Sequence, residues 1–429
     1  MPQEQPLPSP GVRTLAVLAV PAIAIGILSA LVLWAMDRTA EALQHVLWDA
    51  MPTALGIPTD SPWLTIAILT ATGTAVGLVV RYVPGHAGSD SATTELDAPP
   101  APLKAVPSIV LAVVLSLAGG VSLGPENPII AINCALVVAL CARFIRAIPP
   151  RISILLATSA TIGALFGTPV AAALVLTGTL AAVRGGGSLW DKLFLPIAAA
   201  SAGALTMHVL GAPSFTFDVP AYDGPTPIDL LTGTLIAAVS AGLGILAAFV
   251  FPLLHRAFHS LRSPVLYTAL GGLVLGILGA IGGPLTLFKG LEQTREIVEN
   301  PGDYTASQLL FFSLVKVVAL LVAASAGFRG GRIFPAVFVG VALGLSAHAL
   351  FPEIPLGLAI ACGGMGIVLV ATRDGWIALF LGIALTGDLG LLPILCVIIL
   401  PTWLIVTKAP PLEVVEKTKP KPTPSEPAT

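Results

Sequence analysis

The chain of 429 residues combines a high apolar content with few charges, which excludes most classes of soluble protein. Hydrophobic residues make up 55% of it, charged residues make up 10%, and the mean hydropathy is +0.94. The formal net charge is -2, so no basic surface suggests a nucleic acid partner. The composition predicts an all-α polytopic membrane protein, placed in the cell membrane as a multi-pass protein.

Apolar segments recur along the whole chain, and several are too short to cross a bilayer alone, since a spanning helix needs roughly 20 residues. The first segment is too long for a signal peptide core, so we keep it in the mature protein. Short segments interrupted by Gly or Pro predict tilted, broken or re-entrant helices, which are typical of transport proteins. The predicted segments are 14–36, 63–81, 102–119, 128–147, 152–164, 169–183, 189–211, 228–254, 264–281, 308–326, 335–350, 355–371, 376–386 and 390–407.

Two polar interruptions, 84–107 and 212–227, divide the chain. The second lies near the midpoint, so we expect one transmembrane domain, 14–407, built from approximate repeats 14–211 and 228–407. Residues 1–13 form a polar N-terminal segment. The tail 408–429 alternates Lys, Glu, Pro and Thr and is expected to be disordered, with no appended soluble domain.

Basic residues cluster in a few connections and in the tail, and the positive-inside rule predicts that these parts are cytoplasmic. They are Arg143, Arg146, Arg151, Arg256, Arg262, Lys417, Lys419 and Lys421. His255 and His259 have the spacing that could place two imidazoles on one helix face. Because no companion Glu or Cys motif accompanies them, we interpret this stretch as a basic interfacial segment and expect no metal. No nucleotide-binding or hydrolase motif appears, and no cofactor is expected.

Glu126 departs most from the apolar pattern, because a carboxylate at membrane depth is costly and usually faces a cavity, a partner or a transport path. It lies in the stretch Gly124–Pro128. A second break of the same form, Gly-x-x-x-Pro, occurs at Gly331–Pro335. Gly permits close backbone approach, and Pro in a first helical turn loses no hydrogen bond. Each motif therefore predicts a helix N-terminus exposed within the membrane.

Two such N-termini could bind a small anion between them. Each presents unpaired N–H donors and partial positive charge, worth up to ~2 kcal/mol to a partly buried anion. Binding without a full charge also lets a conducted ion leave. The carboxylate of Glu126 can compete for the same donors, which makes it a candidate gate. A capping acid that only complements the helix dipole is the alternative, and the second motif favours the gate.

These residues resemble the signatures of the CLC family of chloride channels and chloride/proton antiporters, over about residues 60–407. Ser122–Pro128 is similar to the family's GREGP signature, Gly330–Pro335 resembles GGxFxP, and residues 84–91 resemble the region of GSGIP. The resemblance implies that Glu126 gates the pathway and that Ser89 donates its hydroxyl to the central anion. The full implied set of anion-binding residues is Ser89, Gly124, Pro125, Asn127, Arg332, Ile333 and Phe334.

Three weaker matches follow in the family's order, at residues 166–171, 363–366 and 386–393. The departures concern side chains near the implied anion path. Asp90 places an acid beside Ser89, and no tyrosine stands near the C-terminus where the family has a second side-chain ligand. The proton-transfer position of the family's antiporters falls on Thr179, which lacks a carboxylate. Lys316, inside an apolar run, either attracts anions or snorkels to an interface.

The resemblance implies an inverted-repeat fold, a homodimer with one pathway per subunit, and transport of a small anion, with chloride first. It describes a divergent bacterial-type member without cytoplasmic regulatory domains, and not an enzyme. Because of Thr179 we favour a passive voltage- or pH-gated channel over coupled transport. The alternatives are a proton-coupled antiporter for chloride, fluoride or nitrate, a membrane-embedded enzyme that uses Glu126 as acid or base, and an inactive or regulatory relative.

Overall fold

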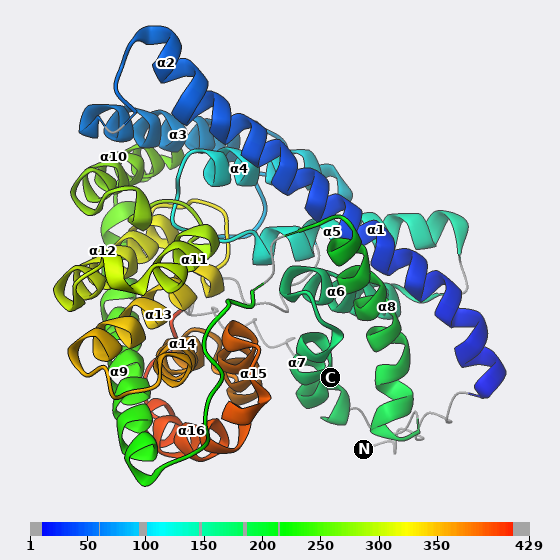
Figure 1. Cartoon of the computed structure of the whole chain (residues 1–429). Helices are drawn as coiled ribbons and strands as arrows, with labels where there is room; N and C mark the ends of the chain where they lie inside the picture. Colours follow the sequence, from blue (N-terminus) through cyan, green and yellow to red (C-terminus); the bar gives the residue numbers. More distant parts are fainter. Residues whose placement is uncertain are drawn as a thin grey trace, which may run out of the picture.

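The computed structural model describes residues 11–59, 61–93, 101–145, 148–182, 187–212 and 215–414, and this part of the chain is built from helices (Figure 1). Nine of its helical segments are long and apolar enough to cross a membrane. The prediction of an all-α polytopic membrane protein is therefore confirmed. The helices are α1 (Val12–His45), α2 (Met51–Leu55), α3 (Pro62–Tyr82), α4 (Val106–Ala118), α5 (Glu126–Phe144), α6 (Pro150–Phe166), α7 (Pro169–Ala182), α8 (Leu189–Val209), α9 (Pro227–His259), α10 (Pro264–Gly282), α11 (Leu291–Glu299), α12 (Ala306–Ser325), α13 (Ile333–Leu350), α14 (Leu356–Thr372), α15 (Gly375–Thr386) and α16 (Leu392–Val406).

Local sequence signals set many of the helix ends. Helices α3, α6, α9 and α10 begin with proline in the first turn, where its missing N–H costs no hydrogen bond. Helix α9 also starts with a capping box, in which Thr226 and Asp229 bond to each other's backbone N–H groups. Helices α6 and α15 end at Gly167 and Gly387, both in the left-handed conformation that glycine adopts readily.

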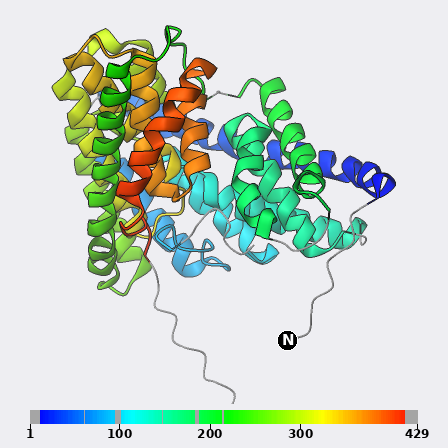
Figure 2. The ribbon, with the colours of Figure 1, turned by 90° about the horizontal axis from the view of Figure 1, so that it is seen from below.

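The order and packing of the helices recur in the two halves of the chain. Helices α1 and α9 have 34 and 33 residues, α5 and α13 have 19 and 18, and α6 and α14 have 17 each. Helix α5 packs on α6 as α13 packs on α14, and α1 packs on α8 as α9 packs on α16. Figure 2 shows most helices of the second half on one side of the molecule and most helices of the first half on the other. This correspondence supports the repeats predicted at 14–211 and 228–407, which remain a prediction.

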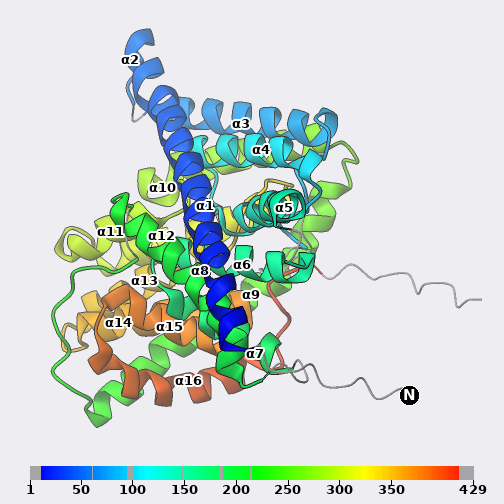
Figure 3. The same ribbon diagram turned by 90° about the vertical axis from the view of Figure 1, so that its right-hand side faces the viewer.

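Two helices join the halves along a seam of glycines. Helix α3 packs along α10. A Cβ atom on Gly73 would lie 2.3 Å from the carbonyl oxygen of Thr268, and one on Gly272 would lie 2.2 Å from that of Leu69. The two backbones approach this closely because small residues leave room for them. Helix α1 runs along its own half of the molecule, where it packs on α4, α6 and α8 (Figure 3).

The C-terminal segment is ordered beyond the predicted boundary at residue 408. Leu412 is buried, and the N–H of Val414 donates to the carbonyl of Ala92 at 2.8 Å. Arg373 donates to the carbonyls of Val406 and Ala409. Contacts with the folded domain therefore position residues 409–414, and the predicted start of the disordered tail at residue 408 remains a prediction. Residues 415–429 lie outside the described part of the chain, and so do residues 1–10 of the predicted polar segment 1–13.

Candidate functional site

The two Gly-x-x-x-Pro motifs meet at their glycines. Gly124 and Gly331 form an antiparallel backbone pair, with N–H to carbonyl oxygen distances of 2.9 and 2.6 Å. Helix α5 begins at Glu126 and α13 begins at Ile333, so both helix N-termini start within two residues of this pair. Residues 207 positions apart in the sequence are thus joined at one point in the interior.

The carboxylate of Glu126 lies at this junction and is fully buried. Its Oε1 accepts a hydrogen bond from the backbone N–H of Phe334 at 2.8 Å. Its Oε2 is buried without a hydrogen-bond partner. A bond from an amide to a charged acceptor is strong, whereas a buried polar atom without a partner is unusual in proteins. The side chain is therefore held at the N-terminus of α13 through one oxygen only.

Both glycines are required by how closely the backbone approaches this carboxylate. A Cβ atom on Gly331 would lie 1.9 Å from Oε2 of Glu126, and one on Gly124 would lie 2.2 Å from the same atom. Any other residue at either position would occupy the space that the carboxylate fills. The carboxylate thus lies between the two motifs, where the sequence predicts that an anion binds.

The other residues of the two motifs surround this space. Pro125 is the buried N-cap of α5, and Asn127 is half-buried in its first turn. Ile333 and Phe334 are buried in the first turn of α13. Arg332 is buried at the N-cap of α13, and its guanidinium donates to the carbonyl of Leu412. Its side chain thus contacts the C-terminal segment. The anion-binding roles of these residues remain predictions.

The loop after α3 places a serine other than Ser89 against the second motif. Ser89 is exposed. Ser91 is buried, donates its hydroxyl to the carbonyl of Phe328 at 2.7 Å and accepts from the N–H of Gly330 at 2.8 Å. Ser91 is therefore the hydroxyl that contacts this motif, and a role for Ser89 in binding an anion remains a prediction.

Asp90 is engaged by groups on the α9 side of this loop. Its Oδ1 lies 3.8 Å from the Arg329 guanidinium and accepts from the N–H of Ala92. Its Oδ2 faces His255 and His259. Burial alone would raise the pKa of Asp90, but hydrogen bonds with the two histidines and the charge of Arg329 lower it below its ordinary value. Asp90 is thus a charged group with basic neighbours.

The predicted proton-transfer residue, Thr179, lies in α7, and its side chain is outside the described part of the structure. The neighbouring Gly178 is exposed. The importance of a missing carboxylate at this position therefore remains a prediction.

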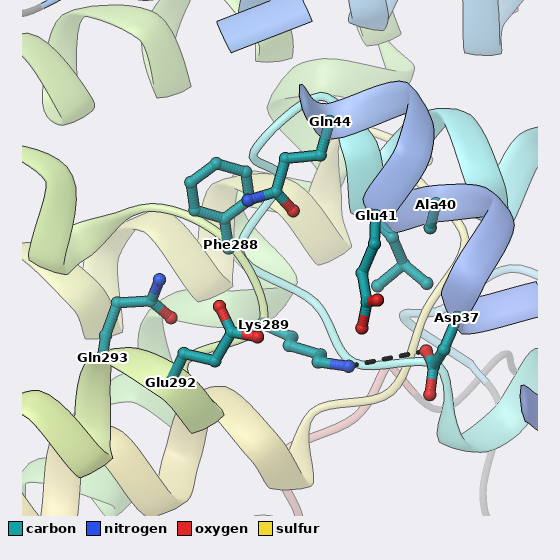
Figure 4. A pocket seen from close by; sticks show the side chains of 9 residues that line it. Asp37, Ala40, Glu41, Gln44, Phe288, Lys289, Glu292 and Gln293 are labelled. Carbon is teal, nitrogen blue, oxygen red and sulfur yellow. Dashed lines mark hydrogen bonds and ion pairs between the residues drawn. The ribbon is translucent and has the colours of Figure 1, made fainter. Parts of the chain in front are cut away.

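A charged cavity leads to the junction of the motifs. Pro125 and Phe334 line it, together with Asp37, Glu41 and Lys289. In the adjoining pocket the Nζ of Lys289 reaches the Asp37 carboxylate at 3.4 Å, and the side chains of Glu41 and Glu292 lie around this pair (Figure 4). The charge of Lys289 also acts on Glu126. Sequence reasoning missed Lys289, although it is the one basic residue between the apolar segment that ends at 281 and residue 294.

Lys316 neither snorkels nor lies in this cavity. It is fully buried in α12, and its Nζ donates to three carbonyl oxygens, those of Thr286 at 3.1 Å, Leu287 at 2.7 Å and Phe288 at 2.8 Å. An ammonium has three N–H donors, so all of them are used. The lysine therefore binds the backbone that leads to Lys289.

The predicted polar linker supplies an aromatic side chain to the site. Phe215 is buried, and its ring centroid lies 4.7 Å from that of Phe334 and 5.4 Å from that of Phe166. Both ring pairs are tilted, and aromatic contacts at these distances stabilise the packing. Sequence reasoning missed Phe215; its alternation with Phe217 among polar residues was the available signal.

Comparisons with known proteins show which family the chain resembles. A family model described as voltage gated chloride channel matches residues 72–406. The chain is 46% identical over 416 residues to the "Putative ion-transport protein YfeO" of Escherichia coli (strain 55989 / EAEC), which covers 96% of this chain and 98% of that protein. The protein of the same name in Escherichia fergusonii has the same identity and coverage.

Solved structures share the fold at low sequence identity. A slow cyanobacterial Cl-/H+ antiporter matches with a TM-score of 0.77 and 18% identity, over 92% of this chain and 96% of that one. A CLC-type fluoride/proton antiporter matches with a TM-score of 0.67 and 19% identity, over 94% of this chain and 99% of that one.

Proposed function

The chain belongs to the voltage gated chloride channel family, the CLC family, and from this premise we propose that it exchanges a small anion, chloride first, for protons. Anion transport across the membrane is the function of the family. The observation that carries the proposal is the position of Glu126, whose carboxylate fills the space between two helix N-termini and can carry a proton.

The geometry supports a cycle in which the carboxylate and the anion alternate. Ionised Glu126 accepts from the N–H of Phe334 and occupies the junction. Protonation removes its charge and weakens it as an acceptor, so the side chain leaves for the cavity beside Lys289. The anion then takes the N–H donors of the first turn of α13, where the helix dipole favours negative charge. Return of the ionised side chain expels the anion.

Exchange is favoured over the passive channel that the sequence suggested. Both solved structures described above are of anion/proton antiporters. The channel is the second candidate, and the observation that favours it is the residue type at Thr179, which cannot carry a proton as a carboxylate does. Fluoride is the other candidate anion, because one of these two structures is a fluoride/proton antiporter.

Flux measurements in reconstituted vesicles distinguish these functions. We expect a proton gradient alone to drive chloride uphill through the wild-type protein. Glu126→Gln should keep chloride flux but lose proton-driven transport, whereas the matched control Glu299→Gln, at the end of α11, should behave as wild type. Chloride that moves only down its own gradient would favour the channel. Flux no faster than in empty vesicles would refute anion transport, and fluoride is tested in parallel.

We also propose that the protein is a homodimer with one pathway in each subunit, because the family resemblance implies it. The mass of the purified protein in detergent, measured by light scattering, tests this state. An enzymatic role for Glu126 is not proposed, since members of the family are transporters or channels.

A further inference from the structure

Three side chains with metal-binding atoms converge where α9 ends. His255 and His259 lie one turn apart in the last turns of α9, and Asp90 lies on the loop after α3. The Nε2 atoms of His255 and His259 lie 3.6 and 3.4 Å from the Oδ2 of Asp90. The three potential ligand atoms are all within 4.8 Å of one another. No carboxylate near the histidines in the sequence could be paired with them. The fold supplies one from Asp90, which lies 165 residues before His255.

The hydrogen bonding of His259 shows which of its two nitrogens carries a hydrogen and which one faces Asp90. Its Nδ1 lies 3.0 Å from the carbonyl oxygen of His255, which can only accept, so Nδ1 carries a hydrogen. In the neutral ring the Nε2 atom is then an acceptor, and it faces a carboxylate oxygen. The Nε2 of His255 faces the same oxygen and is buried without a hydrogen-bond partner. A neutral His259 would therefore set its lone pair against the carboxylate, so either a proton on the ring or a metal ion must lie between these atoms.

The separations fit a metal ion better than a proton. An imidazolium and a carboxylate joined by a proton lie about 2.7–2.9 Å apart. Zinc binds nitrogen and oxygen ligands at about 2.0–2.2 Å, which puts neighbouring atoms of a tetrahedron about 3.3–3.6 Å apart. The measured 3.4 and 3.6 Å fall in that range. A metal-bound histidine also usually donates its other N–H to a carbonyl or carboxylate, as His259 does.

The surroundings leave one side of the cluster accessible. The side chain of His259 is 30% exposed and that of Asp90 is 22% exposed, which gives an ion a path and leaves room for water. Arg329 lies beside the other carboxylate oxygen, Oδ1, and its charge opposes a bound cation. Tyr267 stacks on His259 with ring centroids 4.5 Å apart and steadies that ring.

We propose that Asp90, His255 and His259 form a binding site for a divalent transition-metal ion, with Zn²⁺ as the representative ion and a fourth position left to water. Occupancy of this site would tie the end of α9 to the loop that carries Ser91. Because Ser91 bonds to Phe328 and Gly330, the bound metal would steady the second motif from its far side. The site does not depend on the proposed anion/proton exchange.

The test is a Zn²⁺ titration of the full-length protein in detergent, by calorimetry after treatment with a chelator. We expect one Zn²⁺ per chain. The double variant His255→Ala/His259→Ala should lose at least about 100-fold in affinity, because loss of a residue that only supports a ligand costs about 10- to 100-fold. The control His208→Ala changes an exposed histidine of α8 and should bind as wild type. If the wild type binds no Zn²⁺, the cluster holds a proton only, and the proposal is overturned. Equal binding by the double variant would also overturn it.

A second measurement covers the case in which the double variant fails to fold. Co²⁺ replaces Zn²⁺ in nitrogen and oxygen sites and shows strong visible absorption when it is four-coordinate. We expect the wild-type protein to show this absorption and to lose it when Zn²⁺ is added. A Co²⁺ spectrum that matches the ion in buffer would refute the site without any variant.

Discussion

Gly124→Ala would place a methyl group against the carboxylate of Glu126. The new Cβ atom would lie 2.2 Å from Oε2, 2.6 Å from Cδ and 2.7 Å from Oε1, and real Cβ contacts do not fall below 3.0 Å. Oε2 must therefore move by at least about 0.8 Å, the difference between 3.0 and 2.2 Å. Such a move breaks or strains the 2.8 Å bond from the N–H of Phe334.

The cost should depend on the Glu126 side chain. Overpacking costs about 1–3 kcal/mol, and a hydrogen bond to a charged group contributes about 1.5–3 kcal/mol. We expect Gly124→Ala to lower stability by about 2 kcal/mol in the wild-type background. In Glu126→Ala the three nearest atoms are gone, so the same change should cost close to nothing. The coupling energy between the two positions is then about 2 kcal/mol.

Two assays test the reasoning on four proteins: the wild type, Gly124→Ala, Glu126→Ala and the double variant. Thermal unfolding in detergent gives the stability differences, and proton-driven chloride flux in vesicles reports whether the carboxylate still reaches the junction. We expect Gly124→Ala to lose proton coupling while chloride flux persists. Gly242→Ala in α9 is the control, because nothing lies within 4 Å of its added Cβ. An unchanged stability and pH dependence in Gly124→Ala, or an equal cost in both backgrounds, would refute the placement of the carboxylate.

Three other substitutions probe the charged groups around the site. Lys316→Met leaves the carbonyls of Thr286, Leu287 and Phe288 without their donor, so we expect a loss of at least about 2 kcal/mol in thermal unfolding. Lys289→Gln changes a half-buried side chain and should alter stability little. The same Lys289→Gln change removes a positive charge beside Asp37 and should slow chloride flux at low ionic strength but not at high ionic strength. The pKa of Asp388 is lowered because its carboxylate accepts from the N–H groups of Tyr222 and Gly390. Its stabilisation is thus complete above its ordinary pKa of about 3.9 and is lost as the pH falls through its folded-state pKa. Melting midpoints of wild type and Asp388→Asn should converge at low pH, and parallel curves would contradict this.

The helices were largely predictable because apolar runs bounded by Gly and Pro have direct physical causes. The first helix extends to His45 instead of residue 36, since its last turns carry the polar residues Asp37 and Glu41 that line the cavity. A prediction from hydropathy ends the helix where its residues become polar, although the helix itself continues along the charged cavity. The ordered segment around Leu412 was missed for a related reason: arginines bind its backbone, and its own composition does not show this.

The site was predictable only where local geometry and chemistry coincide. Glu126 and the two glycine motifs were found because an acid and a helix break within apolar runs are both unusual. The contact of Ser91 with the second motif was not predicted, because the preceding residues 85–88 all have positive φ, which the sequence does not suggest for His86 and Ala87. The contacts of Phe215 and Lys316 depend on distant segments, so only the folded chain reveals them.

The backbone pair between Gly124 and Gly331 constrains which parts of this transporter can move. A cycle in which one half rocks against the other would have to break both of its hydrogen bonds, at about 0.5–1.5 kcal/mol each, and would also shear the glycine seam between α3 and α10. In the cycle proposed above, the moving part is the Glu126 side chain, and the backbone around it stays in place. Chemical cross-links that fix the two halves to each other should therefore leave turnover intact, a property that separates this design from transporters that open by tilting whole domains.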